Sequence, residues 1–216
     1  MELNCYIDHT HLKPFATEKD ILKKCDEAKV YHFASVCVNP CNVAIAARAL
    51  ADSDVHVCSV IGFPFGTHTT AIKVAETVKA IEDGADEIDM VINIGKLIEG
   101  NVDYVCNEVA TLTDTCHSKG KLLKVIIETG YLNEKQIATM CQIVSNTGAD
   151  FIKTSTGYGP RGANFEDIKL FKKYLAPNVK IKAAGGIRTM ADALKFVELG
   201  CSRIGTSNGI PMVKNN

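Results

Sequence analysis

A lysine lies in the middle of an apolar segment, Phe151-Ile-Lys-Thr-Ser-Thr-Gly157, which has the composition of a short buried strand. An ammonium group buried without a partner is costly, so such a lysine tends to lose its proton. A neutral amine is a nucleophile, and its common task in enzymes is to form a Schiff base with a carbonyl compound. On this segment alone, the simpler interpretation is a lysine whose ammonium group reaches solvent at the strand end. Other parts of the sequence are needed to choose between this interpretation and a nucleophilic lysine.

Lys182 and Asp89 are two further ionisable residues in apolar segments. Lys182 belongs to the next predicted strand after that of Lys153, and neighbouring strands lie about 4.8 Å apart. A second positive charge nearby lowers the pKa of a lysine, whereas a buried aspartate such as Asp89 needs a cationic partner. Two interpretations remain open: a catalytic set of nucleophile, charged modulator and proton-transferring carboxylate, or an ion-pair network that only stabilises the interior.

Strand-like apolar segments alternate with helical segments along the whole chain. The strand candidates are residues 5–8, 33–38, 55–61, 87–93, 122–128, 151–156, 179–183 and 203–206. Nearly continuous apolar runs are typical of strands that are covered on both faces in a parallel sheet. Between them, Val74, Val78 and Ile81 predict the packing face of one helix, and Asn133 with Gln136 predicts the capped start of another.

Eight strands that alternate with helices predict one (β/α)8 barrel, a TIM barrel of the α/β class, as a single domain over residues 1–216. The last helix is expected to be short, from about Asn208 to Lys214. An open, doubly wound sheet is the alternative. It fits less well, because no Gly-x-Gly-x-x-Gly turn follows the first strand.

The composition excludes little but sets the context. The chain has a formal net charge of −1, which gives no electrostatic reason to expect nucleic acid, and no apolar run that is long enough to predict a membrane partner. Nine cysteines at irregular spacings, without a signal peptide, predict reduced thiols in a cytoplasmic protein. His9 and His11 have no third ligand at a recognisable spacing, so we expect neither a metal nor another cofactor.

In a (β/α)8 barrel, polar residues at the carboxyl ends of the strands face the active site. The polar residues collected in this way include Asp8, Cys37, Asp89, Lys124, Lys153, Thr156, Lys182 and Ser207. Glycines follow the last three strands at Gly157, Gly185, Gly186 and Gly205. Bare backbone N–H groups in these loops often bind phosphate, so the sequence predicts a phosphorylated substrate.

Seven motifs of the chain resemble those of the deoxyribose-phosphate aldolases, a family of class I aldolases. They are Ile7-Asp-His-Thr10, Gly62-Phe-Pro-Phe-Gly66, Gly84-Ala-Asp-Glu-Ile-Asp89, Lys124-Val-Ile-Ile-Glu-Thr129, Phe151-Ile-Lys-Thr-Ser-Thr-Gly157, Lys182-Ala-Ala-Gly-Gly-Ile-Arg188 and Arg203-Ile-Gly-Thr-Ser207. The resemblance implies a (β/α)8 barrel that reversibly cleaves 2-deoxy-D-ribose 5-phosphate into acetaldehyde and D-glyceraldehyde 3-phosphate. It also implies a homodimer or a higher homo-oligomer.

The same resemblance assigns roles to residues. It implies that Lys153 forms the Schiff base, that Lys182 lowers the pKa of Lys153, and that Asp89 relays protons with Lys182 and a water. Polar positions of the family's pocket match Asp8, Lys124 and Cys37. The loops that bind phosphate in the family match Gly157, Gly185, Gly186, Gly205 and Ser207.

Three positions depart from the family pattern: His11, Tyr158 and Asn208. None belongs to the set of two lysines and one aspartate, so we expect them to change substrate affinity rather than the chemistry. Tyr158 stands where some relatives have lysine, which removes a charge that could bind phosphate. Two other functions stay open at this point: another phosphosugar lyase or isomerase on the same barrel, and a phosphosugar-binding protein without turnover.

Overall fold

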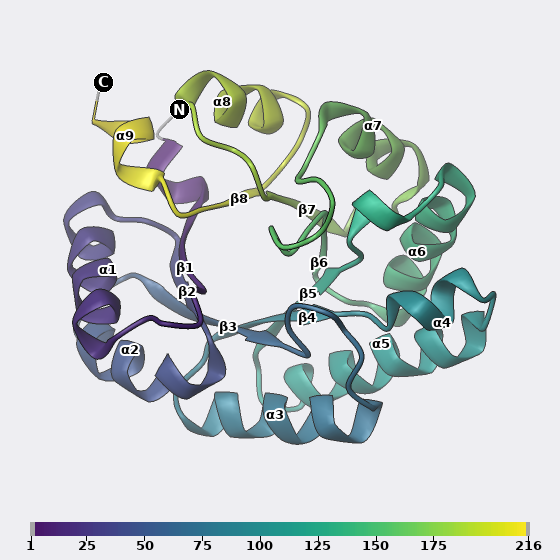
Figure 1. Cartoon of the computed structure of the whole chain (residues 1–216), viewed down its shortest axis with the longest axis horizontal. Coiled ribbons are helices and arrows are strands. Elements are labelled where there is room, and N and C mark those ends of the chain that lie inside the picture. The colour runs from purple at the N-terminus through teal and green to yellow at the C-terminus, as the bar shows by residue number, and fades with distance from the viewer. Residues whose placement is uncertain (1–2, 215–216) are drawn as a thin grey trace.

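The computed structural model describes residues 3–214, and its centre is a closed barrel of eight parallel strands (Figure 1). The strands are β1 (Ile7–His11), β2 (Ser35–Val38), β3 (His56–Ile61), β4 (Glu87–Val91), β5 (Leu122–Ile126), β6 (Phe151–Lys153), β7 (Lys180–Ala184) and β8 (Arg203–Thr206). They follow one another around the barrel in chain order, and β8 pairs with β1 to close it. The predicted (β/α)8 barrel is confirmed, and the open doubly wound sheet is excluded.

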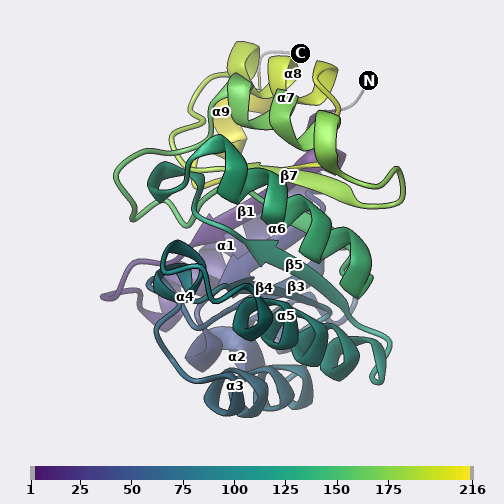
Figure 2. The same cartoon turned by 90° about the vertical axis from the view of Figure 1, so that its right-hand side faces the viewer.

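Helices surround the barrel on its outside (Figures 1 and 2). They are α1 (Glu18–Tyr31), α2 (Val43–Leu50), α3 (Thr70–Glu82), α4 (Ile94–Ile98), α5 (Val102–His117), α6 (Glu134–Thr147), α7 (Phe165–Tyr174), α8 (Met190–Glu198) and α9 (Gly209–Val213), with short 3-10 helices η1 (Leu3–Tyr6), η2 (Pro40–Asn42) and η3 (Thr129–Tyr131). The capping box of Asn133 and Gln136 is present at the start of α6. None of these helices combines the length and the apolar character that a membrane span needs.

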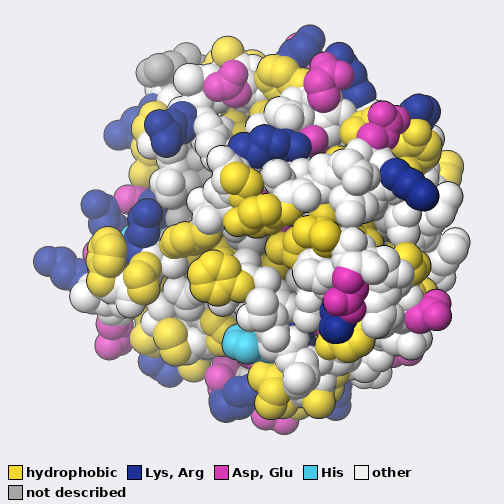
Figure 3. Space-filling view, turned by 45° about the vertical axis from the view of Figure 1, so that its right-hand side comes forward, with side chains coloured by type: hydrophobic (Ala, Val, Ile, Leu, Met, Phe, Trp, Pro, Cys, Tyr) yellow, Lys and Arg dark blue, Asp and Glu magenta, His cyan; other side chains and the backbone are white. Residues whose placement is uncertain are grey.

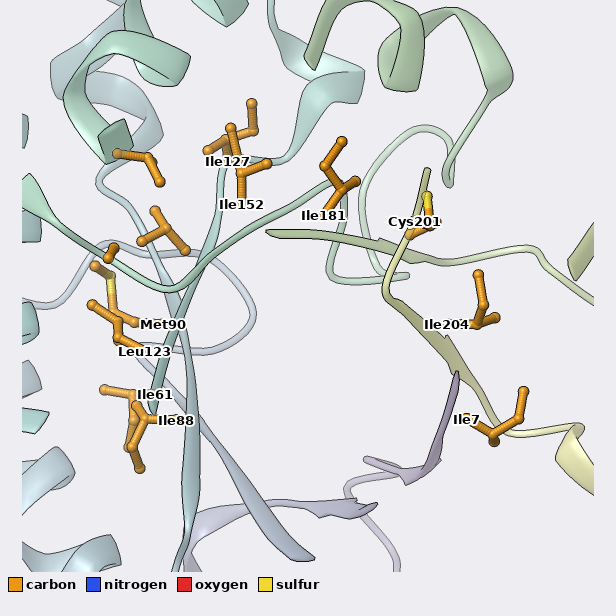
Figure 4. Packing of buried hydrophobic residues seen from close by; sticks show 14 of the residues in the cluster. Ile7, Ile61, Ile88, Met90, Leu123, Ile127, Ile152, Ile181, Cys201 and Ile204 are labelled. Carbon is orange, nitrogen blue, oxygen red and sulfur yellow. The ribbon is translucent and has the colours of Figure 1, made fainter. Parts of the chain in front are cut away.

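Side chains alternate along each strand, and the two faces of the sheet differ sharply in chemistry. Residues that point outward, such as Ile88, Leu123 and Ile152, pack in the main hydrophobic core beneath the helices. Figure 4 shows these side chains directed away from the barrel axis. The residues between them in the sequence, such as Asp89 and Lys124, point inward. The barrel interior is therefore polar over much of its height, and this is where the chemistry of the protein is concentrated.

Only β8 keeps its predicted boundaries; the other seven strands differ from the prediction by one to three residues at one or both ends. The sixth strand ends at Lys153 instead of continuing to residue 156, and the fifth ends at Ile126 instead of residue 128. Glu128 has a φ of 49°, in the left-handed region that interrupts an extended strand. The first strand begins at Ile7, because the preceding residues form η1. Apolar composition alone does not indicate at which residue each strand stops forming hydrogen bonds with its neighbours.

The packing face predicted for helix α3 is confirmed only in part, because Val74 and Ile81 pack against the core at its margin. Its fully buried residues are Lys73, Thr77 and Ala80, whereas Val74 and Ile81 are only partly buried. The Nζ atom of Lys73 contacts Glu108 Oε1 of α5 at 2.6 Å and donates a hydrogen bond to the Val91 carbonyl at 2.7 Å. This buried ion pair between two helices is the physical reason for the correction.

The Lys73–Glu108 pair makes a testable contribution to stability. Replacing Lys73 by methionine leaves the Glu108 carboxylate buried without its cation, which should lower the free energy of unfolding by about 3–5 kcal/mol. Urea titration of the wild type and the variant measures the loss. The double variant Lys73→Met/Glu108→Leu removes both charges and should recover most of it; a double variant as unstable as the single one would show that charge is not the cause.

Candidate active site

Three lysines from adjacent strands converge on the carboxylate of Asp89 inside the barrel. Lys153 of β6 and Lys182 of β7 donate to Asp89 Oδ2 at 2.7 and 2.6 Å, and Lys124 of β5 donates to Oδ1 at 2.7 Å. The strand register places Lys153 beside Lys182, and Asp89 beside Lys124. The two amines that the sequence predicted to be close therefore meet on one oxygen atom.

A second layer of charges lies against this set. Arg203 of β8 donates to Asp8 Oδ1 at 2.7 Å and to Glu87 Oε1 at 2.8 Å. Lys182 also pairs with Asp8, and Lys124 pairs with Glu87 Oε2 at 2.7 Å. Among the described residues, ion pairs thus join four cations to three carboxylates, which leaves one positive charge in excess when every lysine is protonated.

The electrostatic field of the network fixes most of these charges. Burial works to raise the pKa of Asp89, yet Lys124, Lys153 and Lys182 hold that pKa well below its usual value. Burial works to lower the pKa of Lys182, and the adjacent Asp8 and Asp89 carboxylates raise it instead. The pKa of Lys124 is raised by its own carboxylate neighbours in the same way. Asp89, Lys124 and Lys182 are therefore ionised at neutral pH.

A cavity of about 630 Å³ opens above this network at the carboxyl ends of β1, β6, β7 and β8. Lys153 is the member of the lysine trio that lines it; its exposed fraction is 3%, against 0% for Lys124 and Lys182. The other lining residues are Thr10, His11, Leu12, Lys13, Lys24, Thr156, Gly157, Tyr158, Ala184, Gly185, Gly186, Ile187, Arg188, Gly205, Thr206, Ser207 and Asn208. The described lining contains four cations and no carboxylate, so the cavity suits an anionic ligand.

Glycines shape part of the wall of this cavity. Gly157 and Gly185 have φ values of 87° and 88°, which residues other than glycine rarely adopt. Gly205 lies close to the lysine network: a Cβ atom placed on it would lie 3.3 Å from Lys182 Cε and 2.9 Å from the Ala184 side chain. The loops thus expose bare backbone toward the cavity and leave room for Lys182 behind it.

Comparison with known proteins identifies the family. The family model described as DeoC/LacD family aldolase matches residues 3–210. A deoxyribose-phosphate aldolase of Treponema denticola is 65% identical over 213 residues, which cover 99% of both chains. The chain belongs to the DeoC/LacD family of aldolases. It is therefore an enzyme of the lyase class, and its resemblance to the deoxyribose-phosphate aldolases is confirmed.

Other relatives of this aldolase agree in sequence and in fold. A deoxyribose-phosphate aldolase of Thermococcus gammatolerans is 51% identical, with 99% of this chain and 96% of that protein covered. A putative deoxyribose-phosphate aldolase of Coccidioides immitis has a TM-score of 0.95 at 39% identity, covering 99% of this chain and 85% of that one. The tetrameric deoxyribose phosphate aldolase of Aeropyrum pernix has a TM-score of 0.92 at 31% identity, covering 98% and 89%.

The aldolase brings most of the predicted site residues together, in two layers. Lys153, Thr156, Gly157, Gly185, Gly186, Gly205 and Ser207 line the cavity. Asp8, Asp89, Lys124 and Lys182 lie beneath it and are fully buried. Cys37 does not line the cavity; it is fully buried and packs with Leu12, Cys58 and Val60 inside the barrel.

Sequence reasoning did not identify several residues that the aldolase places at its site. Glu87 and Arg203 complete the ion-pair network, and both lie two residues before an inward-facing position, so strand alternation could have found them. Lys24 comes from helix α1, where its Nζ donates to the Ser207 carbonyl at 3.3 Å. No local sequence signal indicates that contact, because it joins residues 183 positions apart.

Tyr158 spans the mouth of the barrel. Its hydroxyl donates to the Leu12 carbonyl at 2.9 Å, and Glu128 Oε2 accepts from the Thr156 N–H of the same loop at 3.0 Å. Thr156, Tyr158 and Glu128 also border a second cavity of about 360 Å³, whose walls include Phe65 and other apolar residues. Figure 3 shows hydrophobic side chains gathered across one face of the molecule, and Phe65 and Tyr158 are among the large hydrophobic residues that are exposed.

Potential metal ligands occur together at one place among the described residues. Cys37, Cys58 and Asp89 are all buried, and each places one potential ligand atom within 4.8 Å of those of the other two. Both oxygens of Asp89 already accept hydrogen bonds from lysine ammonium groups. A metal ion at this position would have to displace those cations, so the donor set does not fit a resident metal.

His9 lies outside the barrel wall, beside the cavity residue Lys24, and makes stability depend on pH. Burial lowers its pKa from 6.5 to about 4, while Glu27, which contacts His9 Nε2 at 2.7 Å, raises it. Between these values the unfolded chain binds a proton that the folded chain does not, so stability falls as the pH drops from 6.5 to 4.

We expect the His9 contribution to reach about 3 kcal/mol at the acidic end of this window. Replacing His9 by glutamine, which keeps a hydrogen-bonding group near Glu27, should flatten the dependence of the unfolding free energy on pH in that window. Urea titrations at several pH values, on wild type and variant in parallel, measure it. Equal slopes for the two proteins would contradict the assignment.

Proposed function

We propose that this aldolase reversibly cleaves 2-deoxy-D-ribose 5-phosphate to D-glyceraldehyde 3-phosphate and acetaldehyde through a Schiff base on Lys153. The observation that carries the proposal is the position of Lys153 Nζ, which lies at the floor of an anion-accepting cavity and 2.7 Å from a carboxylate that two other lysines also bind. The names of the relatives support deoxyribose 5-phosphate as the substrate, and the geometry of the site supports Lys153 as the nucleophile.

The charge balance of the network supports Lys153 as the nucleophile. When Lys153 loses its proton, three cations remain against three carboxylates, so the buried network becomes neutral overall. Lys124 pairs with three carboxylates and Lys182 with two, and neither lysine lines the cavity. The network can thus hold the neutral, nucleophilic amine of Lys153 without an excess of either charge.

In the proposed reaction, the Lys153 amine adds to the aldehyde carbon of the open-chain sugar, and loss of water gives an iminium ion. The iminium accepts the electron pair of the carbon–carbon bond that breaks, so an enamine of acetaldehyde remains on Lys153 and glyceraldehyde 3-phosphate leaves. Protonation of the enamine carbon and hydrolysis release acetaldehyde. No metal is needed for these steps, because the cationic imine itself withdraws the electrons.

Asp89 and Lys182 serve proton transfer in this scheme. Both the Lys153 and the Lys182 ammonium groups contact Asp89 Oδ2, so this oxygen connects the reacting nitrogen to a permanently charged neighbour. The low pKa of Asp89 means that it passes protons on, together with water, rather than storing one.

The phosphate group is proposed to bind at the end of the cavity formed by Gly185, Gly186, Gly205 and Ser207. Lys24 and Arg188 line the same cavity and would supply the positive charge that Tyr158 does not. Phosphate held there, away from the reacting carbons, positions the sugar over Lys153.

Product analysis tests the substrate assignment. Incubation with deoxyribose 5-phosphate should release acetaldehyde and glyceraldehyde 3-phosphate in equal amounts, each detected by a coupled dehydrogenase. Release of neither product, despite binding of the sugar phosphate, would point to a binding protein. Conversion to a different sugar phosphate would point to an isomerase on the same barrel.

Replacing Lys182 by leucine tests its separate role. The remaining charges, Lys124, Lys153 and Arg203 against three carboxylates, balance, so the variant should fold. Turnover should fall by about 10²-fold, because the proton relay and the charged neighbour of Lys153 are lost together. Circular dichroism checks the fold, and steady-state kinetics measure the loss. Wild-type rates in a folded variant would remove Lys182 from the mechanism.

We also propose that the aldolase is a cytoplasmic homo-oligomer. The tetrameric relative from Aeropyrum pernix and the nine free cysteines support this. Light scattering coupled to gel filtration measures the oligomeric state.

A further inference from the structure

A pair of cysteines lies inside the barrel, next to the lysine network, and the proposed reaction does not use it. Cys37 of β2 and Cys58 of β3 occupy paired positions in the register of the two strands. Both side chains are fully buried, and both belong to the small interior cluster formed with Leu12 and Val60.

The pair has the geometry that a disulfide requires. Directly paired residues on neighbouring strands have Cα atoms about 4.8 Å apart, within the range of about 4.4–6.8 Å that disulfides span. Their sulfur atoms lie within 4.8 Å of each other. Bond formation therefore needs movement of the two sulfur atoms rather than of the strands.

Cys58 is also in direct contact with the catalytic network. Its Sγ donates to Asp89 Oδ1 at 3.2 Å and accepts from Lys124 Nζ at 3.3 Å. The two carboxylate oxygens of Asp89 thus have different partners. Oδ1 contacts Cys58 and Lys124, and Oδ2 contacts Lys153 and Lys182. A change in the bonding of Cys58 acts on the same carboxylate that orients the reacting amine.

The cavity and the cysteine cluster share one residue. Leu12 lines the cavity and packs against Cys37 and Cys58 in the interior cluster. Leu12 therefore connects the cavity, which is large enough for hydrogen peroxide, to the cluster that holds both sulfur atoms.

The reactivity of Cys37 differs from that of the other buried thiols. The neighbouring Cys58 thiol lowers the pKa of Cys37, although burial and the Asp89 carboxylate oppose it, and the charges of Lys182 and Lys153 act in the same direction as Cys58. By contrast, burial raises the pKa of Cys116, Cys141 and Cys201 to about 12. Among these buried cysteines, Cys37 therefore forms most readily the thiolate, which is the form that reacts with peroxides.

We propose that Cys37 and Cys58 form a reversible disulfide when the protein meets a hydroperoxide, and that this disulfide switches the aldolase off. The Cys37 thiolate attacks one oxygen of hydrogen peroxide, the O–O bond breaks, and Cys37 becomes a sulfenic acid as hydroxide takes up a proton to leave as water. The sulfur of Cys58 then attacks the Cys37 sulfur and releases a second water. In sum, two thiols and one hydrogen peroxide give one disulfide and two waters.

The loss of activity follows from the loss of the hydrogen bond between Cys58 and Asp89. In the disulfide its sulfur no longer carries a proton to donate to Asp89 Oδ1, and it moves to about 2.05 Å from the Cys37 sulfur. Asp89 then keeps Lys124 as its partner at Oδ1 but loses the second contact that fixes its orientation under Lys153. This part of the inference rests on the proposed function, whereas formation of the bond does not.

Peroxide titration with two readouts tests the proposal. Cys5 and Cys41 are exposed, so a Cys5→Ser/Cys41→Ser background removes the thiols that would otherwise react first. After treatment and removal of peroxide, free thiols are alkylated in denaturant, and peptide mass spectrometry locates each linkage. Acetaldehyde release from deoxyribose 5-phosphate is measured in parallel, before and after dithiothreitol.

We expect a peptide in which Cys37 is linked to Cys58, with a mass decrease of two hydrogen atoms. The linked fraction should lose activity at least about tenfold, and dithiothreitol should restore it. In Cys58→Ala and Cys58→Ser, each compared with its own reduced form, the loss that dithiothreitol reverses should disappear. Because the linkage is read by mass, a protein that never releases acetaldehyde tests the bond and refutes only the proposed function.

Three results would overturn the proposal. The first is alkylation of both Cys37 and Cys58 at peroxide concentrations that inactivate the protein reversibly. The second is a fully linked protein with the activity of the reduced form. The third is an undiminished, dithiothreitol-reversible loss of activity in the Cys58 variants.

Discussion

Replacing Lys153 by methionine is expected to lower the turnover of deoxyribose 5-phosphate at least about 10⁴-fold, the scale on which enzymes respond to loss of a covalent nucleophile. The protein should stay folded. Methionine fills a similar volume, and the remaining cations Lys124, Lys182 and Arg203 balance the three carboxylates of the network. Single-turnover kinetics and thermal unfolding measure the two quantities separately.

A matched control exists on the neighbouring strand. Lys180 of β7 is exposed at the opposite end of the barrel, and Lys180→Met removes the same charge without touching the network. It should keep wild-type turnover. A Lys153 variant that retains more than a few per cent of activity in a folded state would exclude the Schiff base at this residue.

Replacing Asp89 by asparagine is the second large change, and it should damage both stability and catalysis. The amide leaves three buried ammonium groups around a neutral side chain, and four cations then face two carboxylates. We expect the free energy of unfolding to fall by about 3–5 kcal/mol. Turnover should fall by about 10⁴-fold, because the oxygen that links Lys153 to Lys182 no longer carries charge. Urea titration and steady-state kinetics measure these effects.

A double variant separates the two effects of this substitution. Adding Lys124→Met to Asp89→Asn removes one of the uncompensated ammonium groups, so part of the lost stability should return while turnover stays low. If activity recovered together with stability, Asp89 would act only as a structural counter-ion, and its assigned role in proton transfer would be wrong.

The grouping of charged residues at the site could be predicted from the sequence because it depends on strands. Lys153, Lys182 and Asp89 are ionisable residues in segments that are otherwise apolar, and neighbouring parallel strands place such residues side by side. The register confirms the pairings of Lys153 with Lys182 and of Asp89 with Lys124. Repetition of strand and helix along the chain was sufficient to predict the closed barrel.

Other parts of the site depend on contacts that no local pattern contains. Lys24 reaches the cavity from a helix, and Tyr158 reaches across the barrel mouth to Leu12. The packing face of α3 was predicted only in part for the same reason, since Lys73 is buried because α5 supplies Glu108. An isolated helix pattern marks such a lysine as solvent-facing, and its partner is known only once the helices are packed.

Chemical trapping of the covalent intermediate tests the central claim most directly. Borohydride added during turnover of deoxyribose 5-phosphate should reduce the imine and inactivate the enzyme, and peptide mapping should place a two-carbon adduct on Lys153 alone. The Lys153→Met variant should acquire no adduct. Inactivation with an unmodified Lys153, or an equal adduct on another lysine, would contradict the account.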